Sequence, residues 1–156
     1  VSSGAVSGWS FSGTTFFRDL TNDSTSYAAT RRMSYNVSQM QFLRNLSRQT
    51  LGEDNFTLLH GNIHCNPAEY FTIRERKNDY IVIVKNVKLR PKDDFFQSFI
   101  LEYPGRPDSE VFFHTKVFKI DKFGNYIAYR NITFAGEVST KRIGDLLPWD
   151  YKPINF

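Results

Sequence analysis

The chain has 156 residues, a formal net charge of +4, 16% aromatic residues and one cysteine. This length suits one domain with its own core, and a single cysteine excludes an intramolecular disulfide and every CxxC motif. No apolar run approaches the ~18 residues of a membrane span, so we expect no membrane span. The basic residues are scattered and have acidic neighbours, so we expect no nucleic-acid partner.

The first 30 residues are half Gly, Ser or Thr and show no sustained hydrophobic periodicity. This composition is typical of a segment that buries little surface. We therefore predict a flexible arm over residues 1–33 and a single α+β domain over residues 34–156.

The segment Asn36–Leu51 carries apolar residues at spacings of three to five, which predicts an amphipathic helix. Asn36 is the expected N-cap, Gln39 its capping-box partner, and Gly52 the expected stop. Asn45 is expected on the polar side of the helix, facing solvent. Because the apolar stripe is narrow, we expect the helix to lie across a sheet.

After this helix the sequence changes to short β-rich runs that are separated by turn residues. The last two runs flank DKFGN (residues 121–125), which predicts a hairpin loop between them. The predicted strands are Phe56–Cys65 with a break at Gly61-Asn62, Tyr70–Lys77, Tyr80–Leu89, Phe95–Tyr103, Glu110–Ile120 and Tyr126–Phe134.

A helix followed by antiparallel strands predicts an α+β fold, with the helix packed on a strongly bent sheet whose concave face is apolar. Over roughly residues 35 to 135 this element order resembles the cone-shaped NTF2-like superfamily, in which N-terminal helices close the mouth of a bent sheet. An all-β barrel is the alternative prediction.

Alternation along the predicted strands places single polar side chains among apolar ones. In a bent sheet these side chains would converge in an aromatic cavity, which is the usual composition of a small-molecule pocket. The alternative is that each one extends to the rim or meets a carboxylate. The predicted ligand-binding residues are Lys85, Gln97, His114, Tyr126 and Arg130.

Two histidines, His60 and His64, lie close to the only cysteine. A Gly-Asn pair between them argues against a helix, and on a strand they would stand roughly 13 Å apart. We therefore predict no metal site and no cofactor. The usual nucleophile, phosphate-binding and zinc-protease motifs are also missing from the sequence, so we assign no catalytic residue.

Five N-x-S/T triplets occur, whereas the composition would give roughly 1.6. This excess favours secretion through a glycosylating pathway. The predicted glycosylation sites are Asn22, Asn36, Asn45, Asn55 and Asn131.

Together these patterns predict a secreted, non-catalytic α+β domain that binds a small apolar ligand or a protein partner through its concave face. Two alternatives stay open. The NTF2-like resemblance implies an isomerase or dehydratase with His114 or a cavity carboxylate as base and Tyr126 as donor. It also implies a structural, oligomerising module, because sheets of this superfamily often pair back to back as a homodimer.

Overall fold

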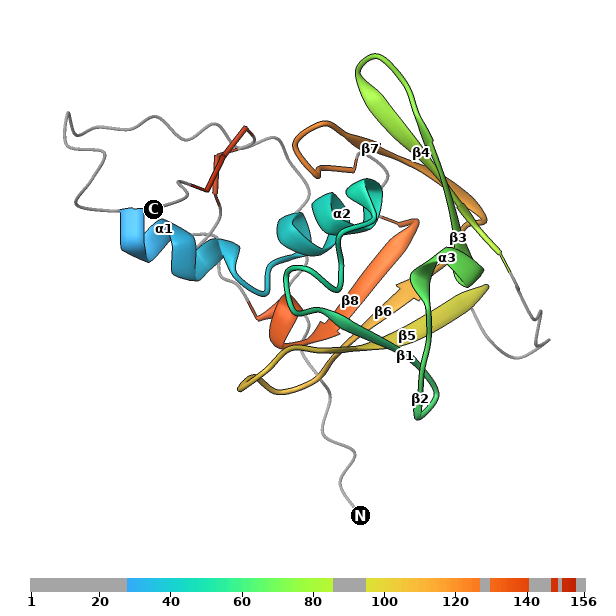
Figure 1. Cartoon of the computed structure of the whole chain (residues 1–156), viewed down its shortest axis with the longest axis horizontal. Helices are drawn as coiled ribbons and strands as arrows, with labels where there is room; N and C mark the ends of the chain where they lie inside the picture. Colours follow the sequence, from blue (N-terminus) through green and yellow to red (C-terminus); the bar gives the residue numbers. More distant parts are fainter. Residues whose placement is uncertain (1–27, 86–94, 127–129, 141–146, 149, 154–156) are drawn as a thin grey trace, which may run out of the picture.

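The structure is a computed structural model that describes residues 28–85, 95–126, 130–140, 147–148 and 150–153. Helices and strands follow one another in the order shown in Figure 1. They are α1 (Ala28–Tyr35), α2 (Gln39–Arg48), β1 (Thr57–His60), β2 (Ile63–His64), α3 (Pro67–Tyr70), β3 (Phe71–Glu75), β4 (Asp79–Val84), β5 (Gln97–Glu102), β6 (Ser109–Phe113), β7 (Val117–Asp121), β8 (Ile132–Gly136) and the 3-10 helix η1 (Glu137–Ser139).

The strands form two antiparallel sheets. One has five strands in the order β2-β1-β5-β6-β8, and the other has three in the order β3-β4-β7. The predicted α+β class is confirmed, and neither sheet closes into a barrel within the described residues. The strands are divided between two sheets rather than joined in one bent sheet.

The predicted strand Glu110–Ile120 is two strands, one in each sheet. Ser109, Val111 and Phe113 are the buried residues of β6, whereas Phe118 and Ile120 are buried in β7. The inward positions therefore change from odd to even numbers across residues 114–116. This change of phase lets the chain cross from the five-stranded sheet to the three-stranded one.

The predicted hairpin around DKFGN is also wrong. β7 pairs with β4, and β8 pairs with β6, so the two strands that follow each other here lie in different sheets. Residues 121–125 still form a tight turn, in which the Asp121 carboxylate accepts hydrogen bonds from the backbone N–H groups of Phe123 (2.8 Å) and Asn125 (2.9 Å).

The N-cap of helix α2 lies two residues later than predicted. Ser38 is the N-cap, and its hydroxyl accepts a hydrogen bond from the Gln41 N–H at 3.1 Å. Gln41 Oε1 accepts in turn from the Val37 N–H at 2.7 Å, so a capping-box-like exchange forms around Ser38 and Gln41. Asn36 instead continues the end of α1, where its N–H donates to the Arg32 carbonyl oxygen at 2.9 Å. The next residue, Val37, adopts a left-handed φ of 60° and so separates the two helices.

Helix α1 occupies residues that the sequence assigned to the flexible arm. Its first six residues fall within 1–33, while residues 1–27 lie outside the described part of the chain. The helix is anchored at its end by Tyr35, which is 6% exposed. The Tyr35 ring packs against Tyr151 with a centroid distance of 5.6 Å.

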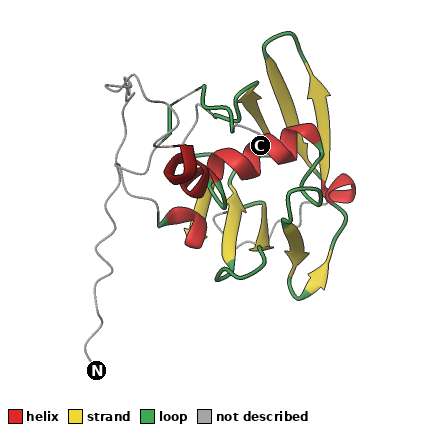
Figure 2. Cartoon of the chain, turned by 60° about the vertical axis from the view of Figure 1, so that its left-hand side comes forward, coloured by secondary structure: helices red, strands yellow, loops and turns green. Residues whose placement is uncertain are grey.

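Helix α2 lies across the inner side of the two sheets (Figure 1), and the view turned by 60° shows the same arrangement (Figure 2). The Phe42 ring on this helix contacts Phe134 of the five-stranded sheet at 5.8 Å. Phe113 bridges the two sheets through ring contacts to Phe71 (5.3 Å) and Phe118 (5.6 Å). Aromatic side chains thus fill the inner side, where the sequence predicted a concave, ligand-binding face.

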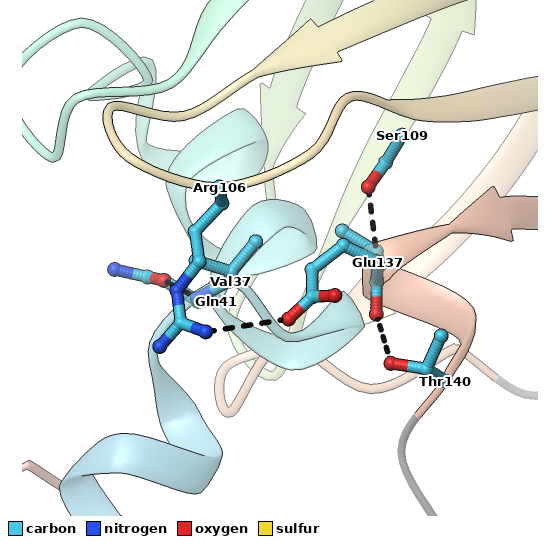
Figure 3. A network of polar contacts seen from close by, with 7 residues as sticks. Val37, Gln41, Arg106, Ser109, Glu137 and Thr140 are labelled. Carbon is cyan, nitrogen blue, oxygen red and sulfur yellow. Dashed lines mark hydrogen bonds and ion pairs between the residues drawn. The ribbon is translucent and has the colours of Figure 1, made fainter.

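The five-stranded sheet ends at η1, whose polar contacts are drawn in Figure 3. The Ser109 hydroxyl accepts a hydrogen bond from the Val138 N–H at 3.0 Å, and the Arg106 guanidinium lies 3.6 Å from the Glu137 carboxylate. These contacts tie the turn before β6 to the chain that leaves β8. They are structural contacts at the edge of the domain.

Candidate functional site

Gln97 and His114, two of the predicted ligand-binding residues, lie on opposite faces of the five-stranded sheet. Gln97 is 6% exposed and lies opposite Phe113 on the buried face. His114 Nε2 lies 2.9 Å from Thr133 Oγ1, and Thr133 is exposed on the outer face. The predicted convergence fails here because neighbouring residues along a strand point to opposite faces.

The other three predicted residues, Lys85, Tyr126 and Arg130, have different surroundings. Lys85 Nζ donates a hydrogen bond to the Ala68 carbonyl oxygen at 2.6 Å, and Arg130 is exposed in the turn before β8. Tyr126 packs against the core and its hydroxyl donates to the Ile132 carbonyl oxygen at 3.1 Å. Burial raises the pKa of Tyr126.

The structure therefore does not assemble the predicted pocket from these five side chains. The proposed base, His114, lies beside Thr133 on the outer face, whereas the proposed donor, Tyr126, packs against the core and donates to the Ile132 carbonyl oxygen. The reason is that the alternation along the predicted strand Glu110–Ile120 changes phase across residues 114–116, so His114 does not share the inward face of Phe118 and Ile120. β8 starts only at Ile132.

The predicted glycosylation sites differ strongly in exposure. Asn55 is exposed and adopts a left-handed φ of 63° in a turn, while Asn36 and Asn131 are half-buried. Asn22 lies outside the described residues. Asn45 is 2% exposed, and its Nδ2 atom is buried without a hydrogen-bond partner in the described structure.

The expected position of Asn45 on a polar, solvent-facing side is therefore wrong. Helix α2 is buried continuously from Gln41 to Ser47, because it is covered on more than one side rather than resting on a single sheet. A glycan attached to the Asn45 Nδ2 atom does not fit this packing.

The two histidines near Cys65 do not form a metal site. His60 packs against Tyr70 with ring centroids 5.4 Å apart, whereas His64 is exposed on the short strand β2. The Cys65 thiol donates to the Leu58 carbonyl oxygen at 3.4 Å, and burial raises the pKa of this thiol. Among the residues that the structure describes, no three His, Cys, Asp or Glu side chains are placed to hold a metal ion.

Arg44 is a buried charge that the sequence analysis missed. Its side chain is 4% exposed, and the guanidinium donates to the carbonyl oxygens of Phe123 (2.5 Å from Nη2) and Tyr151 (2.8 Å) and to the Tyr35 hydroxyl (3.2 Å). It joins α1, α2, the turn after β7 and the C-terminal segment. The only indication of this buried charge in the sequence is that Arg44 follows the apolar residue Leu43 within the predicted helix Asn36–Leu51. Its role is architectural, because all these partners belong to the protein itself.

The outer face of the three-stranded sheet combines exposed cations with aliphatic side chains. The strand register places Arg74, Ile81 and Lys119 in one row across the sheet. The next row consists of Thr72, Ile83 and Val117. These six residues alternate with inward residues such as Val82 and Phe118, so they point away from the core.

We call these six residues the cationic face. Arg74 and Lys119 are exposed at its two sides, and Val117 is 51% exposed. Within the described part of the chain, neither Arg74 nor Lys119 forms an ion pair. In the first row Ile81 stands between the two exposed cations, and Ile83 and Val117 add two aliphatic side chains in the next row.

One end of the cationic face carries two carboxylates, since Asp79 lies directly opposite Asp121. The Asp121 carboxylate is occupied by the turn that follows β7. Asp79 Oδ1 is buried and has no hydrogen-bond partner in the described structure. Asp79 is the first residue of β4 and Asp121 is the last residue of β7. The basic residues Arg76 and Lys77 lie in the β3–β4 hairpin, which extends beyond the rest of the sheet (Figure 1).

No family model, curated protein or solved structure matches this chain. The resemblance to the NTF2-like superfamily therefore stays a prediction. In the described ranges, none of the helices has the length and apolar character needed to cross a membrane.

Proposed function

We propose that this chain is a non-catalytic protein-interaction domain that binds a protein partner through the cationic face. The row Arg74–Ile81–Lys119 is the observation that carries this proposal. Protein interfaces commonly have an apolar centre and a polar rim. Ile81, Ile83 and Val117 supply such a centre, and the two cations supply the rim.

The chemistry of the face favours a protein over two other kinds of ligand. A small apolar ligand needs a concave pocket, but the inner side of the sheets is occupied by rings such as Phe99 (1% exposed) and Phe113 (0%). A single-stranded nucleic acid is usually held by aromatic side chains that stack on its bases. The cationic face has aliphatic side chains at its centre instead. A surface with carboxylates around an aliphatic patch is the best complement.

Secretion is part of the proposal. It is supported by the number of sequons and by the position of Asn55, which stands exposed in a turn where a glycan has room. A secreted interaction domain would meet its partner outside the cell.

A displayed peptide library provides the test. Peptides are selected on the wild-type chain and on the double variant Arg74→Glu/Lys119→Glu, with Arg48→Glu as a control, because Arg48 is an exposed cation on α2 outside the face. The expected result is enrichment of acidic and aliphatic sequences on the wild type and the control, and at least about tenfold weaker binding to the double variant.

Two outcomes would overturn the proposal. Selected peptides that bind the double variant as well as the wild type would place the binding surface elsewhere. Retention of the wild type on an immobilised polyanion, lost in the double variant and without enrichment of acidic peptides, would make the face a polyanion site.

A further inference from the structure

We infer that the partner of the cationic face is a second copy of this chain, bound head to tail through the outer face of its five-stranded sheet. This inference rests on the proposed function and names the partner for the same site. It follows from the charges and apolar side chains that the two sheets present to solvent.

The outer face of the five-stranded sheet is acidic and apolar. The register places Leu59, Ile100 and Glu110 in one row across β1, β5 and β6. Leu59 is only 7% exposed, so Ile100 and Glu110 are the residues of this row that reach solvent. Phe112 stands in the adjacent row, and Glu102 follows Ile100 on the same side of β5. We call these five residues the acidic face.

The two glutamates of the acidic face are available for intermolecular contacts. Glu110 is exposed and Glu102 is partly exposed, and neither forms an ion pair within the described residues. His114 lies on the same side of the sheet near the β8 edge, beside Thr133. Carboxylates around the aliphatic residue Ile100 match the aliphatic centre and the cations of the cationic face.

Charge decides which faces of two copies can meet. A symmetric contact of the cationic face with itself would bring Arg74 and Lys119 of both copies together, and like charges at an interface oppose binding. A symmetric contact of the acidic face has the same defect. A contact between unlike faces pairs each cation with a carboxylate and buries aliphatic side chains on both sides.

Such a contact is heterologous, so a pair of copies keeps one unused face of each kind, the acidic face on one copy and the cationic face on the other. The two faces belong to different sheets that lie on different sides of α2 (Figure 1). One copy can therefore hold two neighbours at the same time. The result is an assembly that grows beyond a dimer, either as a closed ring or as an open filament. This differs from the back-to-back homodimer that the NTF2-like resemblance implies.

Sedimentation velocity of charge-reversed variants tests this inference. The cationic-face variant is Arg74→Glu/Lys119→Glu, and the acidic-face variant is Glu102→Lys/Glu110→Lys. Each variant alone carries the same sign of charge on both faces, so we expect it to be monomeric from about 5 to 200 µM. An equimolar mixture restores pairs of unlike faces, and we expect it to associate.

The wild-type chain should associate over the same concentration range, and about 500 mM NaCl should weaken this association at least about tenfold relative to 50 mM NaCl. Arg48→Glu and Glu53→Lys are matched controls, since both residues are exposed and outside the two faces. Both controls should behave as the wild type does. Circular dichroism verifies that every variant is folded, and the single variants Lys119→Glu and Glu110→Lys replace any double variant that is not.

Three results would overturn the inference. They are a monomeric wild type at the highest concentration, undiminished association in either double variant, and a mixture that stays monomeric. A monomeric wild type together with acidic peptides enriched on the cationic face would reject only the second copy as partner. Failure of the peptide selection as well would reject the proposed function.

Discussion

Arg44 brings a full positive charge into the interior, where its hydrogen-bond partners are neutral oxygens. The Tyr151 carbonyl and the Tyr35 hydroxyl each accept one of its N–H groups, and the Phe123 carbonyl accepts from both Nε and Nη2. A planar group with five donors suits such a junction, and a lysine does not reproduce its geometry. Removal of the guanidinium would leave the partly buried carbonyl oxygens of Phe123 and Tyr151 without these donors.

We expect Arg44→Met to lower the free energy of unfolding by about 3 kcal/mol, because hydrogen bonds to charged groups contribute about 1.5–3 kcal/mol each and the lost apolar packing is small. Arg44→Lys should recover only part of this loss. Urea denaturation measures both values. Arg48→Met, at an exposed position of the same helix, is the control and should change the value by less than about 0.5 kcal/mol. An equal effect at both positions would contradict the architectural role of Arg44.

From the raised pKa of the Tyr126 hydroxyl we predict that the folded chain loses stability at high pH. Burial raises the pKa of its hydroxyl, so the folded chain holds this proton more tightly than the unfolded chain, whose tyrosines titrate near 10. The stabilising contribution is complete below about pH 10 and is lost as the pH rises through the higher pKa of the folded state. Burial also raises the pKa values of Tyr35 and Tyr151, which add to the same slope.

Tyr126→Phe removes one of these groups and the hydrogen bond to Ile132. We expect a loss of about 1 kcal/mol at pH 7 and a shallower fall in stability above pH 10. Urea melts at a series of pH values give both quantities. A variant with the wild-type slope above pH 10 would show that the Tyr126 proton is not linked to folding.

At the scale of the elements, the turn after β7, residues 121–125, packs closely against α2. Gly124 has a φ of 89°, and a Cβ atom added there would lie 2.7 Å from the Met40 carbonyl oxygen and 3.0 Å from Arg44 Cβ. Gly105 also has a positive φ, 72°, but nothing lies within 4 Å of its added Cβ. The two positions differ in the approach of the neighbouring helix.

We therefore expect Gly105→Ala to cost about 1 kcal/mol of stability, from backbone conformation alone. Gly124→Ala should cost at least about 2 kcal/mol, because the turn must also move away from α2. Thermal or urea denaturation of the two variants measures the difference. Equal losses would mean that the contact between this turn and α2 contributes nothing.

The sequence located most of the elements but not their partners. The run from Phe95 to Tyr103 contains β5, and the break predicted at Gly61-Asn62 lies between β1 and β2. These features depend on local alternation and turn chemistry, which single segments reveal. The division into two sheets depends on hydrogen bonds between distant strands, and the phase change across residues 114–116 has no local signal stronger than the alternation on either side.

The same limit explains the candidate site at the scale of the whole molecule. Arg74, Ile81 and Lys119 lie on three strands, and only the register brings them into one row. The sequence shows each as an ordinary strand residue, and the scattered charges therefore predicted no basic surface. The predicted pocket failed for the converse reason, since it joined residues such as Gln97 and His114 whose strand faces are opposite.

The whole-molecule packing also predicts which sequons can carry a glycan. Asn55 is exposed in a turn, whereas Asn45 is enclosed between α2 and its neighbours with 2% of its surface exposed. In a glycosylating host we expect Asn55→Gln to remove one glycosidase-sensitive step from the mass of the secreted chain. Asn45→Gln should leave the glycan mass unchanged, because chains glycosylated at Asn45 cannot complete this packing and should not be secreted in folded form. A secreted, folded chain with a glycan on Asn45 would require α2 to stand away from the sheets, and a wild-type mass that glycosidase does not change would remove the support for secretion.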